Sequence, residues 1–191
     1  VVGGFGLDEI LNTKRYSRNQ IEKKLNYKFK AKNLLVTFHP ETSGEKKPAQ
    51  QMEELLRALS ETEHGLIFTM PNADNGGHIL FEMIERFVKN HADRACFRIS
   101  LGSRLYISTL FEVDGVVGNS SSGIIEAPAI KKGTINIGAR QDGRLKATSI
   151  IDCSADHDSI SKSLKKLYSE NFVKTLPKTK SLYGNGGAAK K

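Results

Sequence analysis

The sequence has only two cysteines, Cys96 and Cys153, and no run of apolar residues long enough to cross a lipid bilayer. The cysteines lie in apolar, strand-like segments without the spacing of metal ligands. We therefore expect two buried free thiols and neither a disulfide nor a redox pair. The segment 1–10 lacks the basic region and the cleavage site of a secretory signal. These absences predict a cytoplasmic protein without membrane attachment.

Aromatic residues make up only 7% of a chain whose formal net charge is +8. The lysines are scattered in adjacent pairs and are not interleaved with aromatic residues on one face, as in a nucleic-acid-binding surface. We therefore expect these lysines to lie on solvated helix surfaces and the protein to bind no nucleic acid. We also expect no bound metal and no cofactor. A length of 191 residues with 38% hydrophobic and 26% charged side chains is ordinary for one soluble globular domain.

Short apolar runs alternate along the chain with segments of helical periodicity. A short helix is expected within residues 1–12, and the helix that follows it, at 17–25, has Ser17 as N-cap and Gln20 three residues later, which is a capping box. Strands that alternate with helices indicate an α/β fold, here a Rossmann-like parallel sheet with helices on both faces. We predict strands at 33–38, 65–69, 94–100, 114–117, 134–137 and 149–152, and helices at 17–25, 45–60, 77–90, from 102 onward, 122–130 and 154–168.

The segment 113–144 carries the clearest sign of function. Its strand 114–117 is followed by a turn of glycine, asparagine and serines, and then by the helix 122–130. Free backbone N–H groups and the positive end of the helix dipole therefore face outward at the carboxyl end of the strand, which suits a phosphate. Ser120 and Ser121 add hydroxyl donors. The alternative is that these serines only cap the helix.

Two further features extend this phosphate site toward a nucleotide. Glu126 lies one turn into the helix, where a carboxylate is placed to accept hydrogen bonds from both hydroxyls of a ribose. The next strand is followed by Arg140 and Arg144, whose guanidinium groups can clamp a diphosphate, although such arginines are often only solvated. Phosphate donors, a ribose acceptor and an arginine clamp at successive strand ends fit ligand binding at the carboxyl edge of a parallel sheet.

Two motifs stand in this part of the chain, GNSSSGIIEAP at 118–128 and TINIGARQDGRL at 134–145. Together they resemble the C-terminal half of the hydrolysing UDP-N-acetylglucosamine 2-epimerases of the sialic-acid and legionaminic-acid pathways. Three more segments agree with this family, LLVTFHPET at 34–42, FTMPNADNGG at 68–77 and SLYGNGGA at 181–188. The resemblance therefore covers essentially the whole chain.

This resemblance implies that residues 1–191 form the single UDP-binding, C-terminal domain of a two-domain GT-B-type enzyme, with 1–12 as the hinge segment. The N-terminal half, which in the family carries the acid and base carboxylates, is absent from this sequence, and the chain stops as though its last helix were cut. The implied reaction removes UDP from a UDP-N-acetylhexosamine by elimination across C1 and C2. Water then adds to yield the free 2-epimer, N-acetylmannosamine in the case of UDP-N-acetylglucosamine.

Three further site assignments come from the resemblance. His39 follows the apolar run 33–38 at its carboxyl end, and by position alone it either bonds a neighbouring carbonyl or faces a ligand. The family match makes it the catalytic group that assists the departing diphosphate. Leu101 marks the loop whose backbone holds the uracil. Asp74 and Asn75 are candidates to bind the sugar or to close the cleft.

Other interpretations stay open at the level of the sequence. The chain is alternatively a stand-alone nucleotide-binding module without catalysis. Ala139 stands where relatives often have a polar residue, and Asn185 with two glycines replaces a common DGN, so one ligand contact and one turn depart from the family pattern. The sequence does not choose between UDP-N-acetylglucosamine and a diacetamido analogue. It also leaves the oligomeric state open, a homodimer included.

Overall fold

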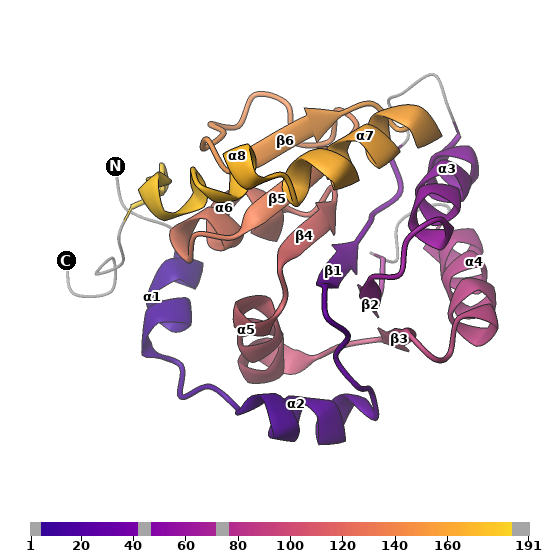
Figure 1. Cartoon of the computed structure of the whole chain (residues 1–191), viewed down its shortest axis with the longest axis horizontal. Coiled ribbons are helices and arrows are strands. Elements are labelled where there is room, and N and C mark those ends of the chain that lie inside the picture. The colour runs from indigo at the N-terminus through magenta and orange to yellow at the C-terminus, as the bar shows by residue number, and fades with distance from the viewer. Residues whose placement is uncertain (1–4, 42–46, 72–76, 185–191) are drawn as a thin grey trace.

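The computed structural model describes residues 5–41, 47–71 and 77–184 (Figure 1). At its centre lies a six-stranded parallel sheet in the order β3-β2-β1-β4-β5-β6, which confirms the α/β fold expected from the sequence. The strands are β1 (Asn33–Thr37), β2 (Gly65–Thr69), β3 (Ala95–Arg98), β4 (Gly115–Gly118), β5 (Gly133–Ile137) and β6 (Ile150–Cys153).

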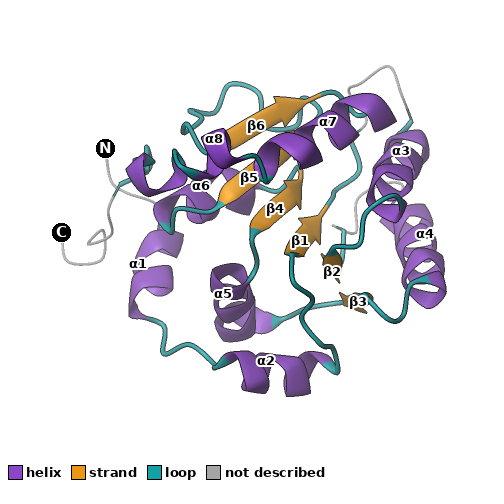
Figure 2. Cartoon of the chain, viewed as in Figure 1, coloured by secondary structure: helices purple, strands orange, loops and turns teal. Residues whose placement is uncertain are grey.

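Helices cover the sheet on both faces (Figure 2). They are α1 (Phe5–Asn12), α2 (Arg18–Leu25), α3 (Pro48–Ser60), α4 (Gly77–Asn90), α5 (Gly102–Glu112), α6 (Ser121–Ala129), α7 (His157–Leu167) and α8 (Glu170–Val173), followed by a short 3₁₀ helix, Leu176–Lys178. The helices α3, α4, α7 and α8 share one apolar core with the sheet, and α2, α5 and α6 share another. No described helix is long and apolar enough to cross a membrane.

Strand β1 shows why the sheet needs both layers. Its five residues are all buried, and consecutive side chains point to opposite faces. Leu34 and Val36 join the core under α3 and α4, whereas Leu35 joins the core under α2 and α5. A continuous apolar run of this kind is typical of a parallel strand covered on both sides.

Local sequence signals set several helix ends. Ser17 and Gln20 form the expected capping box at the start of α2. Helix α7 begins later than predicted, because the side chain of Asp156 caps it by accepting a hydrogen bond of 2.9 Å from the backbone of Ser159. The prediction of two buried thiols is correct for Cys96, but Cys153 at the end of β6 is only partly buried.

The strand order creates one switch point, between the adjacent strands β1 and β4. From β1 the chain continues outward to β2 and β3, and from β4 it continues in the opposite direction to β5 and β6. The loops that follow β1 and β4 therefore diverge and leave a crevice at the carboxyl edge, where such sheets bind ligands. Helix α1 lies beside α5 and α6 (Figure 1). Its Leu7 and Ile10 pack in one cluster with Ile107 of α5.

Candidate functional site

The site is built around a close approach of β1 and β4. Thr37 and Gly118 are the last paired residues of these strands, and Gly118 has a φ of 135°. A Cβ atom at Gly118 would lie 1.9 Å from the backbone oxygen of Thr37. Only glycine fits this position, so the loop after β4 begins in contact with the end of β1.

The next residue, Asn119, is fully buried and links three loops. Its Oδ1 accepts a hydrogen bond of 2.7 Å from the backbone N–H of His39, and its Nδ2 donates one of 2.9 Å to the backbone oxygen of His39. The backbone oxygen of Asn119 accepts from Gln141 Nε2 at 2.8 Å and from Arg140 Nη1 at 3.2 Å. The loops after β1, β4 and β5 are therefore joined through one residue.

Helix α6 starts immediately after this residue. Ser120 is its N-cap and accepts a hydrogen bond of 3.4 Å from the backbone N–H of Ser122, while Ser121 is the first helical residue. The positive end of the α6 dipole therefore lies at the carboxyl edge of β4, as the sequence predicted. Backbone N–H groups in a first helical turn suit the negative charge of a phosphate.

Glu126, one turn further along α6, has a partly buried side chain in a polar cluster. The hydroxyl of Ser122 donates to its Oε2 at 2.6 Å, and the Tyr106 hydroxyl in turn contacts the Ser122 hydroxyl. Burial raises the pKa of Glu126, the hydrogen bond from Ser122 opposes this rise, and the negative charge of Glu9 adds to it. The carboxylate is thus short of solvent and suited to accept hydrogen bonds from ligand hydroxyls.

A cleft of about 440 Å³ opens at the switch point and brings together four of the predicted site residues. His39, Leu101, Ser120 and Glu126 all line it, although they come from the loops after three different strands and from α6. Leu101, predicted to lie at the uracil, and Glu126, predicted to bind the ribose, therefore line the same cavity. Its wall also includes Thr37 and Thr69, whose hydroxyls lie 2.6 Å apart across β1 and β2.

The remaining predicted residues are placed differently. Arg140 is partly buried and reaches the turn through the backbone of Asn119, and Ser121 is adjacent to the cleft-lining Ser120 and Ser122. Arg144 is exposed in the loop after β5. The candidates Asp74 and Asn75 lie outside the described residues.

A second cleft, of about 630 Å³, opens beside the carboxyl ends of β5 and β6. Its charged lining residues are Glu41, Asp142, Asp152, Asp156 and a single lysine, Lys146. Lys146 is already paired with Asp152 at 2.8 Å. Carboxylates line the cleft at the switch point as well, namely Glu9 and Glu126, so charge alone does not decide between the two clefts. The N-terminus of α6 at Ser120 opens onto the smaller cleft and makes it the better candidate for a phosphate. Within 5–41, 47–71 and 77–184, no group of three or more side chains is arranged to hold a metal ion.

Sequence reasoning missed Asn119 and Gln141. Both lie inside the two motifs from which the site was predicted, but neither asparagine nor glutamine by itself indicates a nucleotide site. Their importance comes from burial, with exposed fractions of 0% and 2%, and from bonds to residues far away in the sequence. A polar residue directly after a buried glycine-ended strand was the one available signal.

Comparison with protein families gives a single match over the whole chain. Residues 1–191 match the family model for UDP-N-acetylglucosamine 2-epimerase. The chain is 33% identical to the polysialic acid biosynthesis protein P7 of Escherichia coli, covering 95% of this chain and 46% of that protein. It is also 33% identical to a hydrolysing GDP/UDP-N,N'-diacetylbacillosamine 2-epimerase of Campylobacter jejuni, covering 90% of this chain and 44% of the relative.

Solved structures share the fold at lower identity. A UDP co-structure of MnaA from S. aureus superposes with a TM-score of 0.75 at 18% identity, covering 100% of this chain and 51% of that one. A UDP-GlcNAc 2-epimerase from Methanocaldococcus jannaschii, in complex with UDP-GlcNAc and UDP, gives a TM-score of 0.68 at 14% identity, covering 98% of this chain and 51% of the other. The chain spans about half the length of the curated relatives it matches.

Proposed function

Because the chain belongs to the UDP-N-acetylglucosamine 2-epimerase family, we propose that it is the nucleotide-binding half of a hydrolysing UDP-N-acetylhexosamine 2-epimerase. The observation that carries this proposal is the convergence of His39, Ser120 and Glu126 on one cleft at the switch point of the sheet. A nucleotide needs a phosphate site, a ribose acceptor and a base site in this order, and we assign these three roles to the N-terminus of α6, to Glu126 and to the loop at Leu101.

Each part of the UDP has a designated partner in this proposal. The diphosphate lies at the N-terminus of α6, where the turn at Ser120 and Ser121 donates hydrogen bonds and Arg140 supplies positive charge, with Arg144 as a second arginine. Glu126 accepts from the ribose hydroxyls. The loop at Leu101, on the same cleft, holds the uracil through its backbone.

The chemistry needs two kinds of help. Elimination across C1 and C2 requires a base that removes the C2 proton, and it requires stabilisation of the departing diphosphate. This chain supplies the second, through the α6 turn, Arg140 and His39, whose side chain lies on the same cleft. The C2 base then comes from the other half of the protein, so we expect the 191 residues alone to bind UDP without catalysing the reaction.

The sugar and the cellular setting extend the same proposal. The names of the relatives refer to diacetamido sugars or to polysialic acid biosynthesis. The proposed substrate is therefore UDP-N-acetylglucosamine or its diacetamido analogue. The proposed use of the product is a sialic-acid-type cell-surface polysaccharide. We place the enzyme in the cytoplasm, joined to its N-terminal domain and without a nucleic-acid or membrane partner. A homodimer is the assembly to test first.

Calorimetric titration of the chain with UDP and with uridine tests the binding part. Arg140→Ala should weaken UDP by about 10- to 150-fold, because a charge-assisted contact to phosphate is lost, and should leave uridine nearly unchanged. Arg144→Ala tests the second arginine in the same way, and Arg86→Ala, an exposed arginine on α4, is the control. Equal weakening of UDP and uridine by Arg140→Ala would refute the assigned phosphate site.

The catalytic part is tested by joining the upstream half to the chain. The whole protein should release UDP and the free 2-epimer from a UDP-hexosamine, and His39→Ala and Glu126→Ala should abolish this release. Turnover by the 191 residues alone would show that the base lies in this chain. Saturable UDP binding without turnover by the whole protein would favour the alternative, a binding module without catalysis.

A further inference from the structure

The amide of Asn119 replaces the strand pairing that ends one step earlier. Regular pairing of β1 and β4 stops at Thr37 and Gly118, and the backbone N–H of Asn119 still donates to Thr37 O at 3.2 Å. Beyond this point the side chain takes over, with Oδ1 accepting from the N–H of His39 and Nδ2 donating to its carbonyl. The side chain thus continues the β1–β4 attachment by one residue.

The backbone oxygen of the same residue accepts hydrogen bonds from two side chains of the loop that follows β5. Gln141 Nε2 donates to it at 2.8 Å and Arg140 Nη1 at 3.2 Å. If the side-chain amide of Gln141 were flipped, its Oε1 would face the backbone oxygen of Asn119, and neither oxygen could donate. The orientation with Nε2 toward Asn119 O is therefore the correct one. Gln141 Oε1 is buried and has no hydrogen-bond partner among the described residues. A glutamine that leaves one buried acceptor unpaired is poorly explained by stability alone.

We propose that Asn119 is a positioning residue for the diphosphate, which fixes the α6 turn and Arg140 against the end of β1, and that Gln141 supports it from the loop after β5. This inference rests on the proposed UDP site. A rigid turn keeps the N–H groups of α6 and the guanidinium of Arg140 aimed at one place, so little ordering is needed when phosphate binds. Uridine carries no phosphate and gains nothing from this arrangement.

The inference predicts a selective loss of affinity. Asn119→Ala should weaken UDP by at least about 10-fold and uridine by less than about 2-fold, because only the phosphate contacts depend on the turn. Gln141→Met keeps the size of the side chain but removes the donor, and it should weaken UDP by about 3- to 10-fold with uridine again unchanged. This second variant does not disturb the backbone of His39, so it remains informative where Asn119→Ala folds poorly.

Asn136 gives a matched control. It is also buried, at 1% exposure, and its Nδ2 donates to Asp152 at 2.7 Å, but its side chain joins β5 to β6 and not the loops of the site. Asn136→Ala should lower the urea unfolding midpoint while the ratio of UDP to uridine affinity stays unchanged. If Asn119→Ala likewise lowered the unfolding midpoint but left the ratio of UDP to uridine affinity unchanged, the role of Asn119 would be structural only. That result would overturn the proposal.

A double variant separates positioning from a direct contact. If Asn119 acts through Arg140 and the turn, then Asn119→Ala should weaken UDP by clearly less in an Arg140→Ala background than in the wild type. Fully additive losses would overturn the positioning role while leaving the UDP site intact. Failure of the wild-type chain to bind UDP would instead overturn the proposed function, and this inference with it.

Discussion

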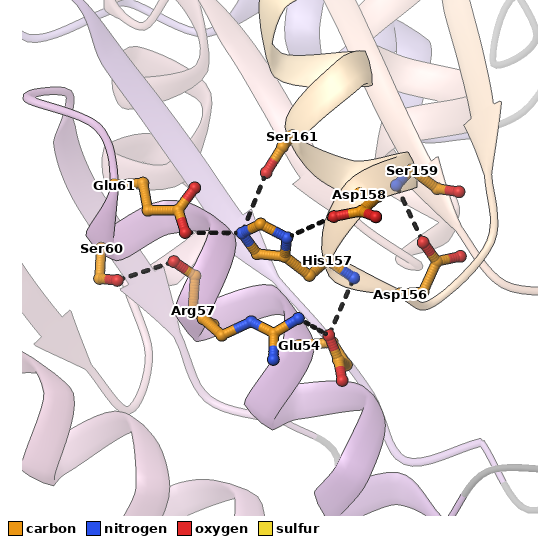
Figure 3. Close-up of polar contacts among 9 residues, drawn as sticks. All are labelled: Glu54, Arg57, Ser60, Glu61, Asp156, His157, Asp158, Ser159 and Ser161. Atoms are coloured by element: carbon orange, nitrogen blue, oxygen red, sulfur yellow. Dashed lines mark hydrogen bonds and ion pairs between the residues drawn. The ribbon is translucent and has the colours of Figure 1, made fainter.

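The imidazole Nε2 of His157, at the start of α7, lies 2.8 Å from the carboxylate Oε1 of Glu61, directly after α3 (Figure 3). The other ring nitrogen, Nδ1, lies 2.8 Å from Asp158 Oδ1. The backbone N–H of His157 also donates to Glu54 Oε2 of α3 at 2.9 Å. This one residue therefore ties together two helices that cover the same face of the sheet, on the side away from the α5 and α6 layer.

The His157 cluster predicts a pH-dependent stability. The hydrogen bond to Asp158, and then that to Glu61, raise the pKa of His157, while partial burial and Arg57 oppose the rise. A raised pKa in the folded state stabilises the protein below the ordinary histidine value of about 6.5. This stabilisation is lost as the pH increases through the raised pKa. In the wild type, the urea unfolding midpoint should therefore decrease as the pH increases through this range. The variant His157→Gln should not show this decrease.

His78 provides the control for that measurement. It pairs with Glu82 at 3.1 Å on α4, but its side chain is 82% exposed, so solvent screens the interaction. His78→Gln should leave the pH dependence of the unfolding midpoint as in the wild type. A wild-type slope that persists in His157→Gln would show that other groups cause it.

A second prediction concerns Glu126 and the ribose. Burial raises the pKa of this carboxyl group, so it takes up a proton at a higher pH than an ordinary glutamate as the pH falls. The protonated form accepts hydrogen bonds less well, so uridine affinity should decrease as the pH is lowered from neutrality, beginning at a higher pH than an ordinary glutamate would cause. Glu126→Gln should bind uridine more weakly at neutral pH and remove this decrease, as followed by NMR titration.

Two comparisons make the Glu126 test specific. Uridine is used because it has no phosphate group of its own that titrates in this range, and 2′-deoxyuridine should show a smaller pH effect, having one ribose hydroxyl fewer. Glu63→Gln, at an exposed position before the amino end of β2, should behave like the wild type. Equal affinity of Glu126→Gln and the wild type for uridine would contradict the ribose assignment.

Gly118 is the third point to test. Gly118→Ala places a Cβ atom 1.9 Å from the backbone oxygen of Thr37 and also keeps alanine at a positive φ of 135°. We expect a loss of at least about 3 kcal/mol in the free energy of unfolding. Gly143 has a φ of 80° but open space around its Cβ position, so Gly143→Ala should cost only about 1 kcal/mol of conformational strain. Similar losses in both variants by urea denaturation would contradict the steric argument.

A fourth prediction concerns Arg94, which is 5% exposed and lies before β3. Its guanidinium donates to the backbone oxygens of His64, Leu59 and Ser60, at 3.0, 3.4 and 3.4 Å, and so satisfies the carboxyl end of α3. Arg94→Ala removes the guanidinium donor from the carbonyls of His64 and Ser60, whereas Leu59 O still accepts from Thr62, and it should cost about 2 to 4 kcal/mol in chemical denaturation. Arg86→Ala should change the free energy of unfolding by less than about 0.5 kcal/mol, and a comparable loss there would refute the assignment.

The sequence by itself determined the elements of the fold and their order. The strand 65–69 and the helix 77–90 match β2 and α4 to the residue, because an apolar run bounded by turn formers and an amphipathic period are local properties. The capping box of α2 followed from two residues three positions apart. Alternation of such segments was sufficient to predict a parallel sheet, and with it a ligand site at the carboxyl edge. The short helix α8 was not predicted, since four residues carry too little periodicity.

Only the tertiary structure decided how the site is held together. His39 and Asn119 are 80 residues apart in sequence, and Gln141 is a further 22 residues away, yet their hydrogen bonds join three loops. No local pattern encodes this, because the bonds depend on β1 and β4 being neighbours and on a glycine that lets them touch. The structure likewise separated Arg140, held at the turn, from Arg144, exposed in its loop, although both lie in one short motif. Residue types predict which groups a site can use, but their burial and mutual distances are set by packing between segments remote in the chain.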